Sequence, residues 1–141
     1  ASRRGAVDLV DAILLNKVDL ELTESRGYTA LMCAAQDGHV DVIDRLLAAG
    51  AQTNTLSKLN RFSAFTLAAR EGHLGIIDRL VIQGADYNHQ DSQGKSALIN
   101  AASRGHVEVV DRILSLNAEI NSCDNNGCSA LYHASKEGKG E

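Results

Sequence analysis

Three residues near the C-terminus have types and a spacing that could bind a metal ion. Cys123, Cys128 and His133 form a C-x4-C-x4-H string, and thiolate and imidazole are side chains that zinc prefers. The string supplies three ligands, whereas a structural zinc site has four, and it occurs once. We therefore interpret these residues as parts of a loop and of a helix face, and we expect no metal site.

The sequence carries none of the short motifs that are typical of catalysis or phosphate binding. A G-x-S-x-G nucleophile elbow, a phosphate-binding P-loop and an H-E-x-x-H metalloprotease motif are all absent. We expect no enzymatic activity and no cofactor.

Three further histidines, His39, His73 and His106, each follow a glycine at a regular interval. Stacked helices lie about 8–10 Å apart, whereas zinc holds each ligand at about 2 Å, so one ion cannot bridge the three. We expect these histidines to hydrogen-bond to the backbone in turns.

The regular interval belongs to a repeat that runs through the whole chain. Glycines stand 33, 34, 33 and 33 residues apart at Gly5, Gly38, Gly72, Gly105 and Gly138. Apolar residues after each Gly-His pair recur at i, i+3 and i+4, which predicts a helix with one buried face. That helix ends at a residue that tolerates left-handed backbone, namely Gly50, Gly84 or Asn117.

An earlier helix in each unit is predicted from a hydroxyl residue followed by alanine. The hydroxyl oxygen can accept a hydrogen bond from the first turn of a helix, and these N-cap residues are Thr29, Ser63, Ser96 and Ser129. A unit is therefore helix, tight turn, helix and hairpin-like loop. Neither helix can bury its apolar face alone, so the units must stack.

The segments TALMCAAQDGH (29–39), SAFTLAAREGH (63–73), SALINAASRGH (96–106) and SALYHASKEG (129–138) resemble the ankyrin repeat, with its unit of about 33 residues and its T-P-L-H-x-A signature. The resemblance covers essentially the whole chain. Proline is absent, and alanine, a good helix former, takes its place. The resemblance implies an all-α solenoid of stacked helix-turn-helix units with hairpin-like loops.

The phase of the repeat divides the single domain, residues 1–141, into five units. Within the first, residues 1–5 are expected to end one helix and residues 6–15 to form the next. Neither end carries a polar capping unit, so we expect a segment of a longer array. The predicted units are partial repeats at 1–23 and 124–141 and full repeats at 24–57, 58–90 and 91–123.

Composition narrows the classes of function. The net charge of −4 argues against general affinity for nucleic acid, which needs an excess of Lys and Arg. No apolar run reaches the 18 or so residues of a membrane span. Three cysteines without a secretory signal indicate reduced thiols, so we expect the protein in the cytoplasm or the nucleus.

The resemblance implies a non-catalytic protein-interaction module, a scaffold or adaptor, that binds a protein or peptide partner in a concave groove. Basic residues outnumber acidic ones at the groove positions, which suggests a partner segment with negative charge, and Tyr28, Arg70 and Arg104 are the leading contacts. The groove positions are Arg26, Tyr28, Gln36, Asp37, Leu59, Asn60, Phe62, Arg70, Glu71, Gln93, Lys95, Ser103, Arg104 and Lys136.

Two other functions stay open. The chain could be a regulatory ankyrin segment of a larger enzyme or channel, in place of a monomeric interaction module within a longer chain. Binding of a nucleotide or short RNA would need aromatic residues beside Lys or Arg, and only Tyr28, Phe62, Lys95 and Arg104 come close. We rank this last function lowest.

Three smaller predictions follow from the repeat phase. Phe65 takes the place of Leu31 and should be buried, whereas Phe62 lies on the loop side with Tyr28 and should be exposed. Asn88 stands where the family can be hydroxylated on asparagine. The pairs Asp44-Arg45, Asp78-Arg79 and Asp111-Arg112 could form a ladder of ion pairs between neighbouring units.

Overall fold

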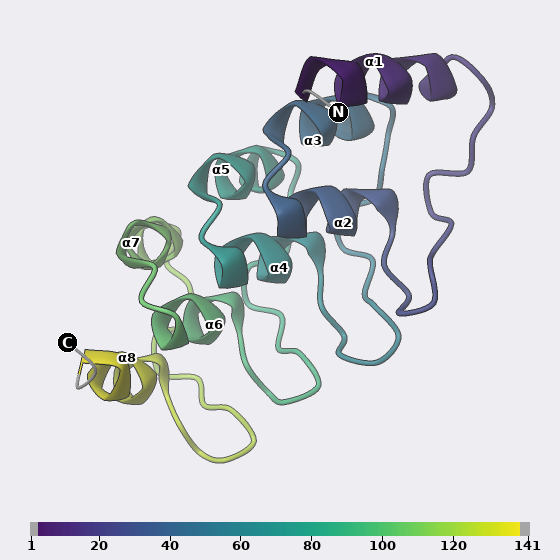
Figure 1. Cartoon of the computed structure of the whole chain (residues 1–141). Helices are drawn as coiled ribbons and strands as arrows, with labels where there is room; N and C mark the ends of the chain where they lie inside the picture. The colour runs from purple at the N-terminus through teal and green to yellow at the C-terminus, as the bar shows by residue number, and fades with distance from the viewer. Residues whose placement is uncertain (1–2, 139–141) are drawn as a thin grey trace.

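The computed structural model describes residues 3–138, which contain eight α-helices and no β-strand. Figure 1 shows the helices in two parallel rows. An inner row holds α2, α4, α6 and α8, and an outer row holds α1, α3, α5 and α7; each helix packs against the next one in its row. The helix bounds are Arg3–Leu14 (α1), Ala30–Asp37 (α2), Val40–Ala48 (α3), Ala64–Glu71 (α4), Leu74–Ile82 (α5), Ala97–Ser103 (α6), Val107–Ser115 (α7) and Ala130–Gly138 (α8).

Each inner helix begins at the predicted N-cap. The hydroxyl oxygen accepts a hydrogen bond from the amide three residues further on, at 3.3, 3.1, 3.2 and 3.2 Å, for Thr29, Ser63, Ser96 and Ser129 respectively. The predicted left-handed residues lie two positions after the last residue of α3, α5 and α7, with φ of 95° at Gly50, 81° at Gly84 and 62° at Asn117. The predicted all-α solenoid is confirmed.

The core lies between the two rows of helices. In the middle units, Phe65 of α4 is 1% exposed, and Ile77 of α5 and Ile99 of α6 are fully buried. The predicted burial of Phe65 is therefore confirmed. Leu131 occupies the same position in α8 but is 77% exposed, because α8 packs mainly against α6.

A ladder of ion pairs links the outer helices, as the sequence predicted. The carboxylate of one unit pairs with the guanidinium of the next in Asp11–Arg45 at 3.0 Å, Asp44–Arg79 at 2.7 Å and Asp78–Arg112 at 2.6 Å. All six side chains are between 38% and 51% exposed, so each pair contributes only about 0–1 kcal/mol.

The first described helix differs from the prediction. Residues 3–5 were expected to end a separate helix, but α1 runs without a break from Arg3 to Leu14, with Gly5 inside it, and packs on α3. That prediction is wrong for residues 3–5, and Ala1 and Ser2 lie outside the described residues. Gly5 lacks the histidine that follows the turn glycines of later units, so nothing at this point favours a turn over helix.

The loop before α4 contains a non-glycine residue in left-handed backbone. Arg61 has φ of 53°, whereas the matching residues Gly27, Gly94 and Gly127 have φ of 82°, 77° and 79°. Hydrogen bonds to the next unit hold this turn: the Arg61 carbonyl accepts from His89 Nε2 at 2.8 Å. The chain thus keeps the turn despite the unfavourable residue.

Replacing Arg61 by glycine should raise the free energy of unfolding by about 0.5–1 kcal/mol. Left-handed backbone costs about 1–2 kcal/mol in a residue with a Cβ atom, and part of this gain is offset by the greater freedom of glycine in the unfolded chain. Urea denaturation followed by circular dichroism measures the change. Arg61→Ala is the control, because it removes the same side chain and keeps the Cβ atom. Equal stability of the two variants would contradict the prediction.

Candidate binding groove

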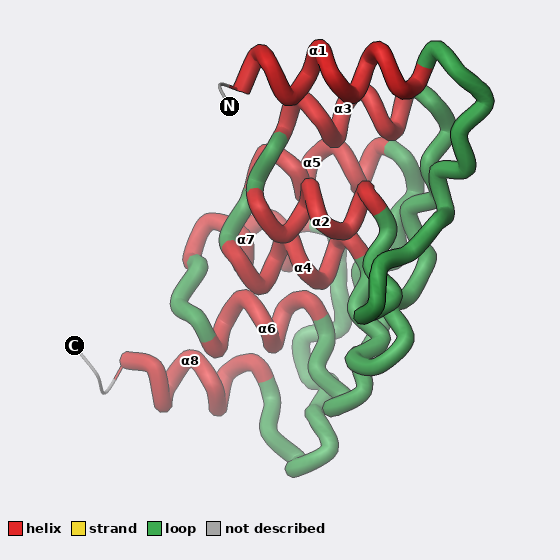
Figure 2. The backbone as a smooth tube through the Cα atoms, turned by 45° about the vertical axis from the view of Figure 1, so that its right-hand side comes forward, coloured by secondary structure: helices red, strands yellow, loops and turns green. Residues whose placement is uncertain are grey.

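The loops between units lie together on one side of the solenoid (Figure 2). Asp91 closes the loop before α6: its Oδ1 accepts from the amides of Gln93 and Lys95 at 2.9 and 3.0 Å, and its Oδ2 accepts from Asn100 Nδ2 at 3.2 Å. Asp91 is not among the groove residues predicted from the sequence. The recurrence of an aspartate 33 residues later, at Asp124, marks the same position of the repeat and could have identified Asp91.

A hollow of about 370 Å³ opens between these loops and the inner helices. Asp91, Ser92 and Asn100 form part of its lining. The predicted groove residues that line it are Arg26, Tyr28, Gln36, Asn60, Phe62, Arg70, Gln93, Lys95, Ser103 and Arg104. We call this the basic hollow.

Four predicted groove residues do not line the basic hollow. Leu59 is 74% exposed at a loop tip, and Asp37 and Lys136 are exposed elsewhere on the inner face. Glu71 lies beside the hollow and pairs with Arg104 at 3.4 Å and with Arg70 at 3.7 Å.

The two loop-side aromatic residues are buried, which corrects the expectation that they are exposed contacts. Tyr28 is 5% and Phe62 9% exposed. The guanidinium carbon of Arg26 lies 4.3 Å from the centroid of the Tyr28 ring, and that of Arg70 lies 5.4 Å from the centroid of Phe62. The two rings form the floor of the hollow, and the guanidinium groups of Arg26 and Arg70 lie over the rings. Burial raises the pKa of the Tyr28 hydroxyl, and the charges of Arg26 and Arg70 oppose that rise.

Four basic side chains line the basic hollow, and three of them (Arg26, Arg70 and Arg104) pair with Glu24 or Glu71 beside it. Arg26 pairs with Glu24 at 2.9 Å, and this hydrogen bond lowers the pKa of the Glu24 carboxyl and raises that of Arg26. Lys95 forms no ion pair with another described residue. The carboxylate among the lining residues, Asp91, already accepts three hydrogen bonds within its own unit.

All three turn histidines were predicted to hydrogen-bond to the backbone; His73 and His106 do so, whereas the His39 ring makes no such bond to a described residue, so the prediction is wrong for His39. His73 Nε2 lies 3.1 Å from the carbonyl oxygen of Gln36, and His106 Nε2 lies 2.9 Å from that of Arg70. Each ring therefore ties one unit to the turn of the unit before it.

Asparagines in the outer loops connect successive units. Asn54 Oδ1 accepts from the amide of Asp86 at 2.9 Å, and Asn88 Oδ1 accepts from the amide of Glu119 at 3.0 Å. The Asn88 side chain is exposed. Hydroxylation at Asn88 stays a prediction.

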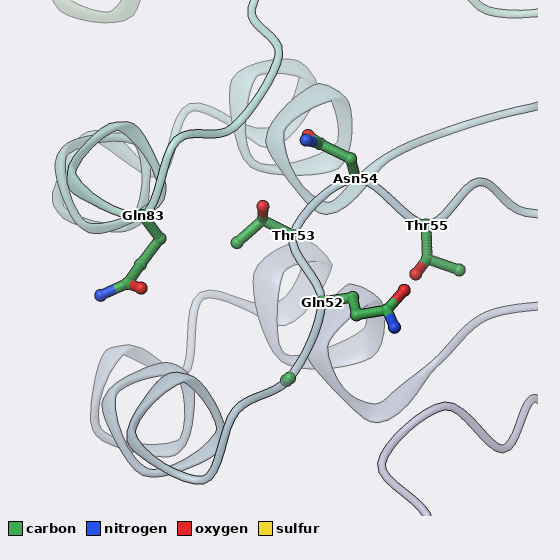
Figure 3. A pocket seen from close by; sticks show the side chains of 6 residues that line it. Gln52, Thr53, Asn54, Thr55 and Gln83 are labelled. Carbon is green, nitrogen blue, oxygen red and sulfur yellow. The ribbon is translucent and has the colours of Figure 1, made fainter.

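A second, polar hollow of about 460 Å³ lies on the loop after α3. Figure 3 shows its side chains spreading to different sides of that loop, with Gln83 across the hollow. Here too the polar groups connect units, because the Gln52 amide and the Thr55 hydroxyl both donate to the Glu21 carboxylate, at 2.9 and 3.0 Å. This surface serves to stack the loops.

The C-terminal string of possible ligands is only partly brought together. Cys128 and His133 do come close, but the third member of the group is the buried Asp124, not Cys123. Burial raises the pKa of the Asp124 carboxyl, but hydrogen bonds from the Cys128 amide, His133 and the Asn126 amide outweigh it, so the pKa lies below its usual value.

No helix in the described part of the chain is both long and apolar enough to cross a membrane. The stacked helix pairs, their loops and the hollow over the inner row define a repeat solenoid with a concave face. A family model described as "Ankyrin repeats (3 copies)" matches residues 1–91 and 65–141, which together cover the chain. The chain belongs to the ankyrin repeat family, whose members are in general modules of protein–protein interaction.

Among curated proteins, human ankyrin repeat domain-containing protein 29 is similar to part of this chain. The two are 40% identical over 55 residues, which make up 38% of this chain and 18% of the human protein. The match therefore spans less than a fifth of that relative's length.

Proposed function

We propose that this chain is a non-catalytic interaction module that holds an acidic segment of a partner protein in the basic hollow. The observation that carries the proposal is the charge of the lining: Arg26, Arg70, Lys95 and Arg104 surround one hollow. The net charge of the whole chain is −4, whereas four basic residues and one carboxylate line this hollow. Such complementarity steers encounter and selects partners by charge.

Because the rings of Tyr28 and Phe62 are buried, we expect the arginines of the hollow to make the main contacts with the partner. Arginine is enriched among residues that dominate binding energy, and its planar group binds a carboxylate through two hydrogen bonds. Arg26 and Arg70 are held over the rings of Tyr28 and Phe62. This support reduces the freedom that each guanidinium loses when a partner binds.

The covered rings do not favour the nucleotide or RNA alternative. Base stacking needs an open aromatic face, and the faces of Tyr28 and Phe62 that border the hollow carry arginines. A regulatory role within a larger enzyme or channel stays a prediction.

Reversing two charges in the hollow should weaken binding of acidic peptides at least tenfold. The variant Lys95→Glu/Arg104→Glu and the wild type are compared by fluorescence anisotropy on a labelled Glu-rich peptide and on its Lys-rich counterpart, at low and at physiological salt. Arg45→Glu is the control, since Arg45 lies on the outer row and is half exposed. The wild type should prefer the acidic peptide. Equal binding by the double variant, or a preference for the Lys-rich peptide, would contradict the proposal.

A further inference from the structure

The last loop and α8 bring together three different metal-binding side chains, none of which lines the basic hollow. One ligand atom from each of Asp124, Cys128 and His133 lies within 4.8 Å of the other two. We propose that these residues bind a transition-metal ion of the zinc type. This site is independent of the proposed partner groove.

The donor set suits such an ion. Zinc and cobalt accept thiolate, imidazole and carboxylate ligands, with bonds of about 2.0–2.3 Å. Ligand atoms on one tetrahedral ion are therefore about 3–4 Å apart, so the three side chains need only small adjustments. Three protein ligands leave a fourth position for water.

The preceding unit shows that the fold does not require this combination of residues. Asp91 occupies the place of Asp124, and Lys95 and Asn100 occupy the places of Cys128 and His133. The hydrogen bonds are the same: the aspartate accepts from the amide four residues on, at 3.0 and 2.9 Å, and from the side chain nine residues on, at 3.2 and 2.8 Å. Lysine and asparagine close the loop in one unit, so loop closure alone does not explain why cysteine and histidine stand there in the next.

The aspartate is already fixed in position. Its side chain is 2% exposed, and its Oδ1 accepts from the amides of Asn126 and Cys128, both at 2.9 Å. Its Oδ2 lies 2.8 Å from His133 Nε2, and the His133 side chain is 16% exposed. Backbone donors that hold a ligating carboxylate are the kind of support that increases metal affinity. On binding, the Cys128 thiol releases its proton to solvent.

Cobalt(II) titration of the reduced, chelator-stripped chain tests the site. A cysteine ligand gives a thiolate-to-cobalt absorption band in the near ultraviolet, which carboxylate and imidazole alone do not give. The wild type should show this band saturating at one equivalent, and Zn²⁺ should abolish it. Absence of the band, or several weak equivalents without it, would overturn the proposal.

Variants separate the site from general surface binding. His133→Asn reproduces the arrangement around Asn100, so the loop should stay folded, and Cys128→Ser removes only the sulfur ligand. Both should bind at least tenfold more weakly, whereas the control Cys123→Ser should bind like the wild type. As a second readout, excess Zn²⁺ should raise the thermal midpoint of the wild type and not that of His133→Asn. A folded His133→Asn variant that binds like the wild type, or loss of binding in Cys123→Ser, would overturn the assignment.

Discussion

Replacing Phe65 by alanine should lower the free energy of unfolding by about 3–5 kcal/mol. The ring is 1% exposed in the middle of the inner row, where helices on both sides of α4 pack against it. Truncation removes the buried apolar surface and leaves a cavity that the neighbouring helices cannot fully close. Urea denaturation followed by circular dichroism gives the difference in unfolding free energy.

The repeat supplies a matched control for this substitution. Leu131 stands at the same position of its unit but is 77% exposed, so Leu131→Ala should change stability by no more than about 0.5 kcal/mol. Phe65 and Leu131 share a position in the repeat, so a difference in the stability lost by the two variants reports burial. A Phe65→Ala variant that loses less than about 1 kcal/mol would show that the core between α4 and its neighbours is not packed as described.

Replacing Gly72 by alanine should lower the free energy of unfolding by about 1.5–3.5 kcal/mol. Its φ of 81° costs a residue with a Cβ atom about 1–2 kcal/mol. The new Cβ atom would also lie 2.7 Å from Nδ1 of His106. That ring is held by its bond to the Arg70 carbonyl, so it must move and weaken a hydrogen bond worth about 0.5–1.5 kcal/mol.

Gly84→Ala separates the two contributions to this cost. Gly84 has the same φ of 81°, but a Cβ atom there would meet no atom within 4 Å. Gly84→Ala should therefore cost only about 1–2 kcal/mol, as measured by the same denaturation experiment. If both variants lose equal stability, the contact between His106 and the turn contributes nothing.

The repeat made the frame of the molecule predictable from sequence. Positions that share a phase share a role, which is why the N-caps, the left-handed helix ends and the ion-pair ladder could be named in advance. Most of the lining of the basic hollow follows from the same phase, because loop tips and inner helices meet on one face.

The phase could not show which side chains of a unit cover one another. Tyr28 and Phe62 were placed on the loop side, but nothing in the spacing says that arginines fold over their rings. The predicted string of possible metal ligands near His133 contained Cys123 in place of its neighbour Asp124, because the spacing does not show which side chain is buried. The backbone of Cys123 forms an isolated β-bridge with Ser129, and Cys123 is exposed. The neighbouring Asp124 is buried and contacts His133.

The bonds between units also determine how the chain reaches its fold. Hydrogen bonds from one unit to the next join residues 28 to 37 positions apart, from the His89–Arg61 bond to the His73–Gln36 bond. Contacts this local keep the contact order low, so folding can start in one pair of units and spread outward by adding neighbours. Units with a neighbour on each side persist longest against local opening. The basic hollow lies over α2, α4 and α6, and these helices belong to units with a neighbour on each side, so its surface should be among the last to open.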